Sequence, residues 1–304
     1  MKIALVGQPN SGKSTLFNAV AGYRSLTSNF AGTTVEYAYS RARVGGEVVD
    51  LFDLPGLYSL NPANPAETCS REFLLGDGWD VLVNVVDASQ LARSLDLTLE
   101  LLDLDAPLVV CLNMMDEAAR KGIVIHSPAL AEALGVPVVE TIAARGQGVV
   151  ETFRAALEIV RVQPPAHLRR IAYAPEVEVA IQRLTQTLGA GPERGDRADS
   201  ADQSLGGRPG GKSQGREPVD FALAAGAGVM VQASAPPEFA KPLPNPRCQA
   251  LQLLQSDPLR AGQLDPAIAD AVESARTGIE LQTRQPADAA ISSARHAACL
   301  NLFE

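Results

Sequence analysis

The sequence predicts an α/β fold with a mostly parallel sheet in residues 1–162, followed by a small all-α domain in residues 163–304. First, strand-length apolar runs alternate with amphipathic helix-length runs up to about residue 158, which is typical of a sheet covered on both faces. Second, polar motifs directly follow several of the strand-like runs. Third, only helical periodicity remains after Pro164-Pro165, which marks a domain boundary.

The composition fits a globular chain and argues against several classes of function. Of 304 residues 46% are hydrophobic, and the formal net charge is −9. Binding to nucleic-acid phosphates needs clustered Lys and Arg, and the sequence has no such cluster. No nucleic-acid partner is therefore expected. The N-terminus leads straight into a strand-like run, so no signal peptide is expected, and no apolar run reaches the roughly 18 residues of a membrane span. The chain as given is expected to be soluble.

The residues that most often bind transition metals are scattered along this sequence. There is no C-x-x-C pair, so the cysteines are expected to be buried small hydrophobic residues in a reducing compartment. No iron site is predicted from the isolated histidines. These residues are Cys69, Cys111, Cys248, Cys299, His126, His167 and His296.

The first expected strand, Ile3 to Val6, leads into Gly7-Gln8-Pro9-Asn10-Ser11-Gly12-Lys13-Ser14. An amphipathic helix is expected from Thr15 to about Ala21. The pattern G-x-x-x-x-G-K-S between a strand and a helix indicates a phosphate-binding loop. A plain turn between strand and helix is the alternative, and the correct flanking elements argue against it.

Each fixed position of this loop has a physical role. Gly7 and Gly12 allow a tight turn whose backbone N–H groups converge on phosphate oxygens, at the positive end of the following helix. Lys13 would place its charge at the β- and γ-phosphates, and the Ser14 hydroxyl would bind Mg²⁺.

Residues 24–36 are polar and are expected to be irregular and mobile. The next stretch predicts a hairpin: a strand from Tyr37 to Val44, a turn at Gly45-Gly46 and a strand from Glu47 to Phe52. This hairpin should add an antiparallel edge to the sheet.

Asp53-Leu54-Pro55-Gly56 follows the hairpin and forms a D-x-x-G motif. The Asp53 carboxylate would hold Mg²⁺ through water, and the Gly56 amide would sense the γ-phosphate, so that the following loop orders or relaxes with nucleotide state. By itself this tetrapeptide could be only a turn. Its place at a strand end, after a phosphate loop, favours the functional interpretation.

Two further buried strands are expected at 81–86 and 107–112, with a helix at 91–104 between them. Asn113-Met114-Met115-Asp116 follows the second, at the sheet edge where open α/β sheets bind ligands. Asp116 can accept hydrogen bonds from guanine N1–H and N2–H₂, a donor pair that adenine lacks. Asn113 would tie the base to the phosphate loop. The alternative is that Asp116 only caps a helix N-terminus.

The last strand of the sheet is expected at 136–140, with Thr141-Ile142-Ala143 at its end and with Gly146 and Gly148 before a helix that runs to Ile159. The backbone N–H of Ala143 is the expected donor to guanine O6. Four nucleotide-binding motifs in this order, each at a strand end, predict a guanine-nucleotide-binding domain.

The C-terminal part is predicted to be helical, with a polar insertion. Residues 189–217 are rich in Gly, Arg, Asp and Ser and contain few large apolar residues, so we expect them to be disordered. Helical periodicity is found at 175–188, 248–255, 266–276 and 288–303.

These motifs together resemble the cytoplasmic N-terminal part of FeoB-type ferrous iron transporters. Many GTPases share the stretch from Gln8 to Asn18, whereas three other stretches are more specific to this family. The resemblance covers nearly all of residues 1–160 and continues in short islands, one of them at 173–184 and another at Ser293-Ala294-Arg295-His296. The three specific stretches are Gly32-Thr33-Thr34-Val35-Glu36, Asp53-Leu54-Pro55-Gly56-Leu57-Tyr58-Ser59-Leu60 and Asn113-Met114-Met115-Asp116-Glu117-Ala118.

The resemblance implies a Ras-like G domain of the P-loop NTPase class, with about six or seven strands, followed by a helical regulatory domain similar to a nucleotide-dissociation inhibitor. It implies Mg²⁺ held by Ser14, Thr34 and Asp53, and an activating K⁺ held by Asn10. The catalytic residues implied are Asn10, Lys13, Thr34 and Gly56. The nucleotide-binding residues implied are Gly7, Asn10, Ser11, Gly12, Lys13, Ser14, Thr15, Thr34, Asp53, Gly56, Asn113, Met114, Asp116, Ile142 and Ala143.

The resemblance also implies a slow, K⁺-stimulated GTPase. Leu57 follows Gly56 where Ras-like enzymes place a glutamine, so backbone and cation would position the water. Glu67 is expected to be a solvated residue rather than a catalytic helper. Ile142 stands where a serine is common, and this weakens the expected grip on the base. Met114 replaces the lysine of N-K-x-D, and its thioether can still pack on the base.

The function that the resemblance implies is a GTP-hydrolysing switch that regulates Fe²⁺ uptake. The implied partners are guanine nucleotide, a transmembrane iron-permease domain of the same polypeptide, a small cytoplasmic Feo protein and a second copy of the chain. The implied location is the cytoplasmic side of the bacterial inner membrane. Two alternatives remain: a soluble GTPase of RNA modification or ribosome assembly, and a nucleotide-binding module with negligible hydrolysis.

Overall fold

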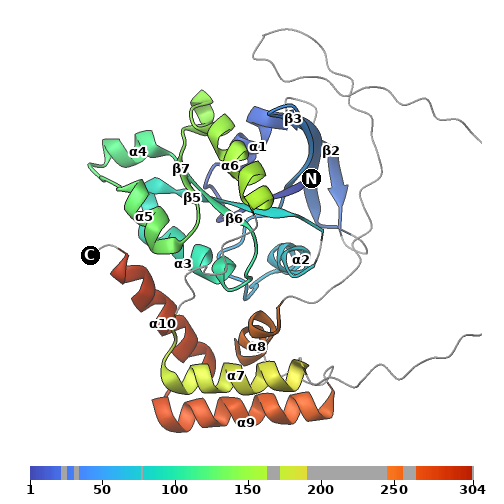
Figure 1. Cartoon of the computed structure of the whole chain (residues 1–304), viewed down its shortest axis with the longest axis vertical. Coiled ribbons are helices and arrows are strands. Elements are labelled where there is room, and N and C mark those ends of the chain that lie inside the picture. The colour runs from blue at the N-terminus through green and yellow to red at the C-terminus, as the bar shows by residue number, and fades with distance from the viewer. Residues whose placement is uncertain are drawn as a thin grey trace, which may run out of the picture.

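The computed structural model describes residues 1–21, 26–30, 34–76, 78–162, 172–189, 245–255 and 265–302. A seven-stranded sheet with helices on both faces forms the larger part, and four helices, α7 to α10, form a second part beside it (Figure 1). The predicted fold class, a mostly parallel α/β sheet followed by helices, is confirmed. The strands are β1 (Lys2–Gly7), β2 (Leu26–Asn29), β3 (Glu36–Val44), β4 (Glu47–Asp53), β5 (Val81–Asp87), β6 (Leu108–Asn113) and β7 (Val138–Glu140).

The strand order is β2-β3-β4-β1-β5-β6-β7. Strand β1 runs parallel to both its neighbours, β4 and β5, and β5, β6 and β7 are also parallel. Strand β3 runs antiparallel to both of its neighbours, β2 and β4. The carboxyl ends of β1, β4, β5, β6 and β7 therefore meet at one edge of the sheet, where each expected nucleotide motif begins.

Helices cover both faces of this sheet. Two of them, α1 (Lys13–Ala21) and α6 (Val149–Val162), pack on one face through a core that includes Phe17 and Phe153. The opposite face packs against α2 (Pro65–Leu74), α3 (Leu91–Leu102) and α5 (Ser127–Leu134). Short helices α4 (Met115–Arg120), η1 (Ala88–Gln90) and η2 (Ala143–Arg145) follow strand ends.

The second part consists of α7 (Pro175–Gly189), α8 (Pro246–Gln255), α9 (Pro266–Thr283) and α10 (Ala287–Asn301). Helices α7 and α9 lie side by side, and α10 runs back from them toward the sheet part, where it contacts α3 (Figure 1). Apolar residues of all four helices belong to the same core cluster as α2 and α3. The second part thus extends the core of one face of the sheet.

A buried charged cluster joins the two parts. The Arg295 guanidinium, on α10, donates to Glu100 Oε1 at 2.9 Å and to Asp103 Oδ2 at 3.3 Å, and also contacts the Tyr173 hydroxyl at 3.1 Å and Gln255 Oε1 at 3.1 Å. Tyr173 donates its hydroxyl to Asp103 Oδ2 at 2.7 Å. Burial raises the pKa of Glu100 and of Asp103 above the usual carboxyl range, and the charge of Arg295 acts in the opposite direction.

The structure corrects several sequence-based expectations. The stretch expected to be irregular contains β2, which pairs with β3 in register Leu26 to Tyr39. Helices α2, α4 and α5 were not predicted, and α9 continues beyond Arg276 to Thr283. The expected disordered insertion lies outside the described residues from residue 190 onward. The division into domains at residue 162 stays a prediction.

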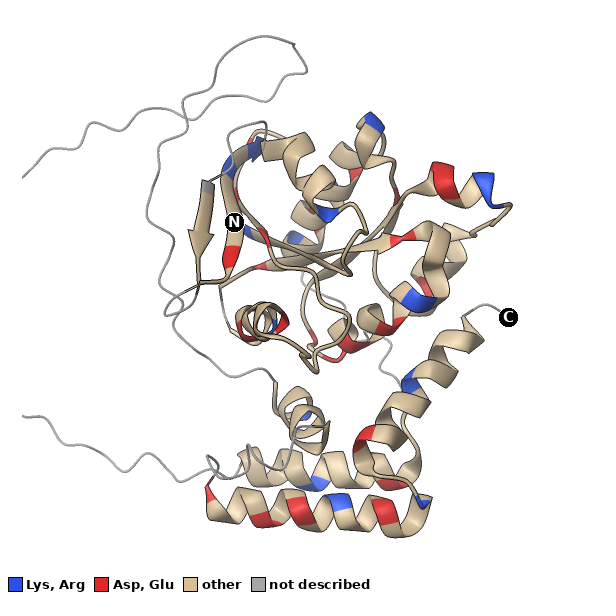
Figure 2. Cartoon of the chain, turned by 180° about the vertical axis from the view of Figure 1, so that it is seen from behind, with Lys and Arg blue, Asp and Glu red and all other residues tan. Residues whose placement is uncertain are grey.

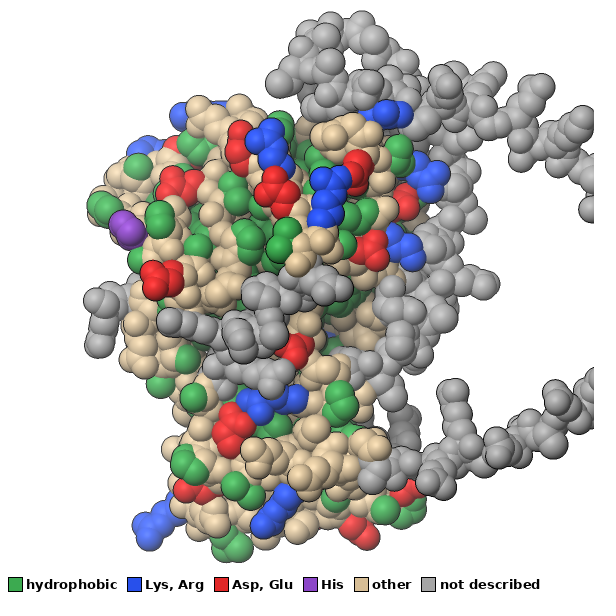
Figure 3. All heavy atoms as spheres, in the orientation of Figure 1, with side chains coloured by type: hydrophobic (Ala, Val, Ile, Leu, Met, Phe, Trp, Pro, Cys, Tyr) green, Lys and Arg blue, Asp and Glu red, His purple; other side chains and the backbone are tan. Residues whose placement is uncertain are grey.

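Charges of both signs share the surface. Figure 2 shows both acidic and basic residues on the helices, with acidic residues predominating along α9, and Figure 3 shows apolar, acidic and basic side chains mixed over the opposite face. Across the described ranges, no helix combines the length and the apolar character that crossing a bilayer requires. In the same ranges, no group of three or more His, Cys, Asp and Glu side chains could hold a metal ion.

Burial predicts inert thiols. All four cysteines are buried and free, and burial raises the pKa of Cys111 to about 11, of Cys248 to about 12 and of Cys299 to about 11. Because the thiolate is the reactive form, these thiols should react slowly with a disulfide reagent at pH 8 in the native protein. The same assay in guanidinium chloride should release four fast equivalents. Rapid labelling of Cys111 or Cys248 without denaturant would contradict the burial described here.

Candidate functional site

The phosphate loop has the backbone that its sequence predicts. Gly12 adopts φ of +84°, and a Cβ added to it would lie 2.1 Å from Asn113 Nδ2, so no larger residue fits. Asn10 also lies in the left-handed region, at φ of 67°, where Asn is tolerated better than most residues. Ser11 Oγ is buried and has no hydrogen-bond partner in the described part of the chain. A buried, unpaired hydroxyl inside this loop is consistent with an absent polar ligand.

Lys13, Ser14 and Asp53 meet at the mouth of this loop. Lys13 Nζ forms an ion pair with Asp53 Oδ1, and Ser14 Oγ donates to Asp53 Oδ2 at 2.7 Å. The hydroxyl and the carboxylate are hard oxygen ligands of the kind that Mg²⁺ prefers, and they already converge. The residues present therefore fit the expected metal. The predicted neighbourhood of Lys13 and Asp53 is observed.

The loop after Asp53 lies directly against the phosphate loop. A Cβ added to Gly56 would come within 2.8 Å of Pro9 N, so glycine is needed for this approach. The Leu57 amide donates to Gly7 O at 3.2 Å, and the Leu57 side chain is fully buried. That side chain cannot orient a water molecule, in agreement with the expectation that other groups do so.

Asn113 links the phosphate loop to the segment after β7. Its side chain is buried, donates from Nδ2 to Ser11 O at 2.9 Å, and accepts at Oδ1 from the Ala143 amide at 2.9 Å. The predicted link between Asn113 and the phosphate loop is observed. The Ala143 amide, which was expected to donate to guanine O6, donates here to Asn113.

The turn that contains Ala143 offers another donor. The Arg145 amide donates to Ile142 O at 2.8 Å and the Gly146 amide to Ala143 O at 3.1 Å, whereas Ala144 lies exposed between them. From the sequence, the Ala144 amide was not considered as a donor. The sequence does not show which amide of this turn is already hydrogen-bonded, whereas the structure shows that the Ala143 amide is bound to Asn113.

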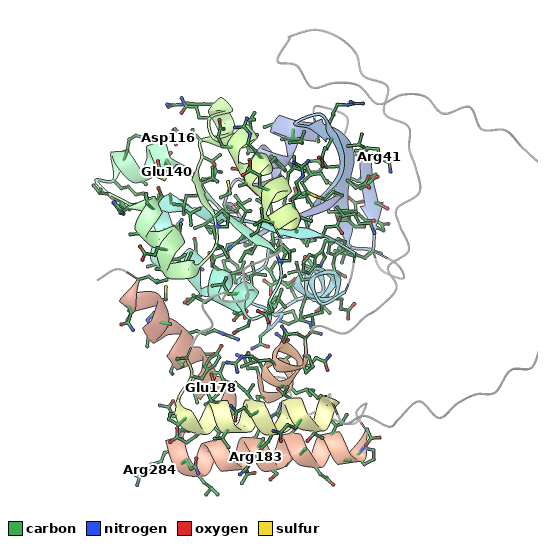
Figure 4. The ribbon with its side chains drawn as sticks, in the orientation of Figure 1. Arg41, Asp116, Glu140, Glu178, Arg183 and Arg284 are labelled. Carbon is green, nitrogen blue, oxygen red and sulfur yellow. The ribbon has the colours of Figure 1, made fainter. Side chains whose placement is uncertain are left out.

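The residues expected to bind the base lie together on α4 and next to it. Met114 has φ of 62°, and its Cε lies 3.5 Å from the position of a Cβ added to Gly12. Asp116 is in the first turn of α4, whose N-cap is Met114, so the alternative that Asp116 is the N-cap is wrong. The Asp116 carboxylate faces Arg145 Nη2 at 3.3 Å, in a pair whose arginine is 63% exposed. Figure 4 shows Asp116 at the opposite end of the molecule from Arg183 and Arg284.

The remaining predicted residues are placed less closely. Thr34 is exposed and borders residues 31–33, which are outside the described part. Ile142 forms an isolated antiparallel bridge with Gln147. Glu67 was expected to be solvated, and this is wrong: it is buried, accepts from the Ala63 amide at 2.8 Å, and donates its own amide to Asn64 Oδ1 at 2.9 Å. This pattern is similar to a capping box at the start of α2, except that the Glu67 side chain binds the amide of Ala63, one residue before the N-cap Asn64.

Comparison with known proteins gives a family match over the same part of the chain. The family described as "Ferrous iron transport protein B" (FeoB_N) matches residues 1–156. A Porphyromonas gingivalis protein named "Fe(2+) transport protein A/Fe(2+) transporter FeoB fusion protein" is 37% identical over 193 residues, 62% of this chain and 22% of the relative. The Escherichia coli K12 "Fe(2+) transporter FeoB" is 41% identical over 162 residues, 52% of this chain and 21% of the relative. The chain thus spans about a fifth of the length of these curated relatives.

Solved structures of similar length agree with this match. S. thermophilus NFeoB bound to GDP·AlF4⁻ and K⁺ superposes with a TM-score of 0.73 at 27% identity, covering 99% of this chain and 98% of that chain. A mutant of the same protein bound to GMPPNP has a TM-score of 0.73, also at 27% identity, with coverage of 99% and 98%. Both superpositions cover nearly all of this chain, so they include its sheet part and its helical part. The chain belongs to the ferrous iron transport protein B family.

Proposed function

We propose that this chain is a GTP-binding and GTP-hydrolysing switch that regulates Fe²⁺ uptake by a larger membrane transporter. The observation that carries this proposal is the convergence of Lys13, Ser14, Asp53, Asn113 and Asp116 at one edge of the sheet. Family membership argues against the alternative of a soluble GTPase for RNA modification or ribosome assembly.

The triphosphate would lie on the loop Gly7–Thr15. Its backbone amides and the Lys13 ammonium would bind the phosphate oxygens, which requires Lys13 to leave Asp53. Ser14, Asp53 and Thr34 would hold Mg²⁺, which when bound neutralises charge that develops on the phosphates. The Gly56 amide, held against Pro9, would face the γ-phosphate.

The base would lie between the loops that Asn113 joins. Asp116 would accept from guanine N1–H and N2–H₂ in place of its present partner Arg145. The exposed Ala144 amide would donate to guanine O6, because the Ala143 amide is engaged with Asn113. Met114 and Ile142 would pack beside the base.

A monovalent cation beside the phosphates would replace an arginine finger. Asn10 is exposed in the phosphate loop. Its backbone is in the left-handed conformation, which asparagine adopts at a lower energetic cost than most residues. The complex of S. thermophilus NFeoB with K⁺ supports this role. Hydrolysis is expected to be slow, because Leu57 is buried and supplies no polar group.

We place the chain on the cytoplasmic side of a bacterial inner membrane, joined to a transmembrane iron-permease domain. The names of the Escherichia coli and Porphyromonas gingivalis relatives support this, and the second is a fusion with Fe(2+) transport protein A, the kind of small Feo partner proposed here. Self-association stays a prediction.

Fe²⁺ uptake by the full-length transporter should be lost when Asp53→Ala is introduced, while the protein level is unchanged.

GTP turnover in KCl and NaCl tests the enzymatic proposal. Turnover should be faster in KCl on the order of tenfold, which corresponds to about 1.4 kcal/mol of transition-state stabilisation. Asn10→Gly should remove this stimulation without backbone strain, and Asn10→Asp, which keeps a ligand oxygen, should retain part of it. No turnover in either salt would support the alternative of a binding module with negligible hydrolysis.

Base recognition can be tested separately by calorimetry. Asp116→Asn should weaken GDP binding by at least about 100-fold, since hydrogen bonds to a charged acceptor contribute about 1.5–3 kcal/mol each. The variant should gain affinity for XDP, because xanthine offers a carbonyl at position 2 to the new amide. Glu117→Gln is the matched control: it removes the neighbouring carboxylate, which pairs with Arg120, and should leave GDP affinity unchanged. Equal losses in both variants would contradict the assignment of Asp116.

A further inference from the structure

The loop that follows Gly56 is attached to the helical part through one carboxylate. Ser59 Oγ donates to Glu100 Oε1 at 2.9 Å and lies 3.0 Å from Oε2, and the Leu60 amide also donates to Oε2. On the other side, Arg295 Nη1 donates to Glu100 Oε1 at 2.9 Å. Glu100 therefore accepts hydrogen bonds from the loop Leu57–Leu60, here called the switch loop, and from α10 at the same time.

This attachment is buried and has few degrees of freedom. Glu100 is 7% exposed and Arg295 is 4% exposed. Arg295 is itself fixed by Asp103 of α3, by Tyr173 before α7 and by Gln255 of α8. A rotation of α10 relative to α3 would therefore move the carboxylate to which the loop is bound.

The loop is held at two points. Toward its beginning the Leu57 amide donates to Gly7 O in the phosphate loop, and toward its end Ser59 and Leu60 donate to Glu100. Gly56 immediately precedes the first point. Since the Leu57 side chain is buried and apolar, orientation of a water molecule would depend on the backbone between these points together with the proposed cation.

We propose that Glu100 and Arg295 are positioning residues for GTP hydrolysis, with Arg295 acting through Glu100 on the loop Leu57–Leu60. The inference rests on the proposed GTPase function and assigns a role to the helical part in the chemical step. Glu100 fixes the end of the loop, and Arg295 fixes Glu100. A loosened loop retains nucleotide binding, because the phosphate and base contacts lie elsewhere, but it loses the near-attack geometry.

The decisive comparison is Glu100→Gln with Asp103→Asn. Both substitutions remove one carboxylate from the same buried cluster around Arg295, but only Glu100 contacts the loop. In steady-state GTP hydrolysis with KCl and Mg²⁺, Glu100→Gln should lower kcat by about three- to tenfold and leave KM within about twofold, because a misplaced backbone affects the chemical step and not binding. Asp103→Asn should lower the melting temperature and lower kcat by less than Glu100→Gln does, because the loop keeps its own contacts with Glu100.

Two more variants test the path from α10 to the loop. Arg295→Lys keeps the charge but cannot reproduce the contacts of the planar guanidinium, so it should lower kcat in the same way. Combined with Glu100→Gln, it should add little further loss, because both act on the same contact. Ser59→Ala lies in the half-buried loop, where folding is not at risk, and should give a smaller drop because the Leu60 amide still donates to Glu100.

The outcomes separate this inference from the proposed function. If the unmodified chain shows no turnover, the proposed GTPase function fails. If the unmodified chain hydrolyses GTP, and Glu100→Gln and Ser59→Ala leave kcat unchanged or Asp103→Asn lowers it equally, the positioning role is overturned. Should Arg295→Lys fail to fold, the Glu100, Asp103 and Ser59 variants still decide.

Discussion

The candidate site depends on one buried carboxamide. Asn113 connects the carbonyl of Ser11 in the phosphate loop with the amide of Ala143 after β7, so three strand ends share one side chain. Without it, a buried acceptor and a buried donor would each lose a partner, at about 1–3 kcal/mol apiece. Gly12 has to be a glycine because this side chain lies against it. Base and phosphate recognition are therefore one rigid unit.

Much of this site could be predicted because strand order brings motifs together. In a parallel sheet every carboxyl end lies at the same edge, so Lys13, Asp53, Asn113 and Asp116 had to converge once their strands were recognised. The roles of Ala143 and Ala144 could not be separated, since that requires knowing which N–H is already bound. Arg145 was missed for a similar reason, because its contact with Asp116 depends on the turn after Ile142.

The errors in the fold also have local causes. Strand β2 has a polar sequence without a strand-like hydrophobic pattern. It forms because it pairs with β3, and the pattern of residues within β2 does not reveal this pairing. Glu67 looks like a surface residue in sequence, but it is buried at the start of α2, where it is hydrogen-bonded to Ala63 and Asn64. The cluster around Arg295 joins residues that are 192 and 195 positions apart, and no spacing rule finds such contacts.

The large sequence separation between Arg295 and its carboxylate partners has a consequence for biosynthesis. Glu100 and Asp103 leave the ribosome long before their arginine does, since 195 positions separate Glu100 from it. A carboxylate buried without a counter-charge is costly, so α3 cannot settle fully against its neighbours at that stage. During synthesis, the Glu100 carboxylate would therefore be expected to stay hydrated until α10 emerges and supplies the positive charge. The contacts of the loop Leu57–Leu60 with Glu100 would then reach their final arrangement only after α10 has been translated.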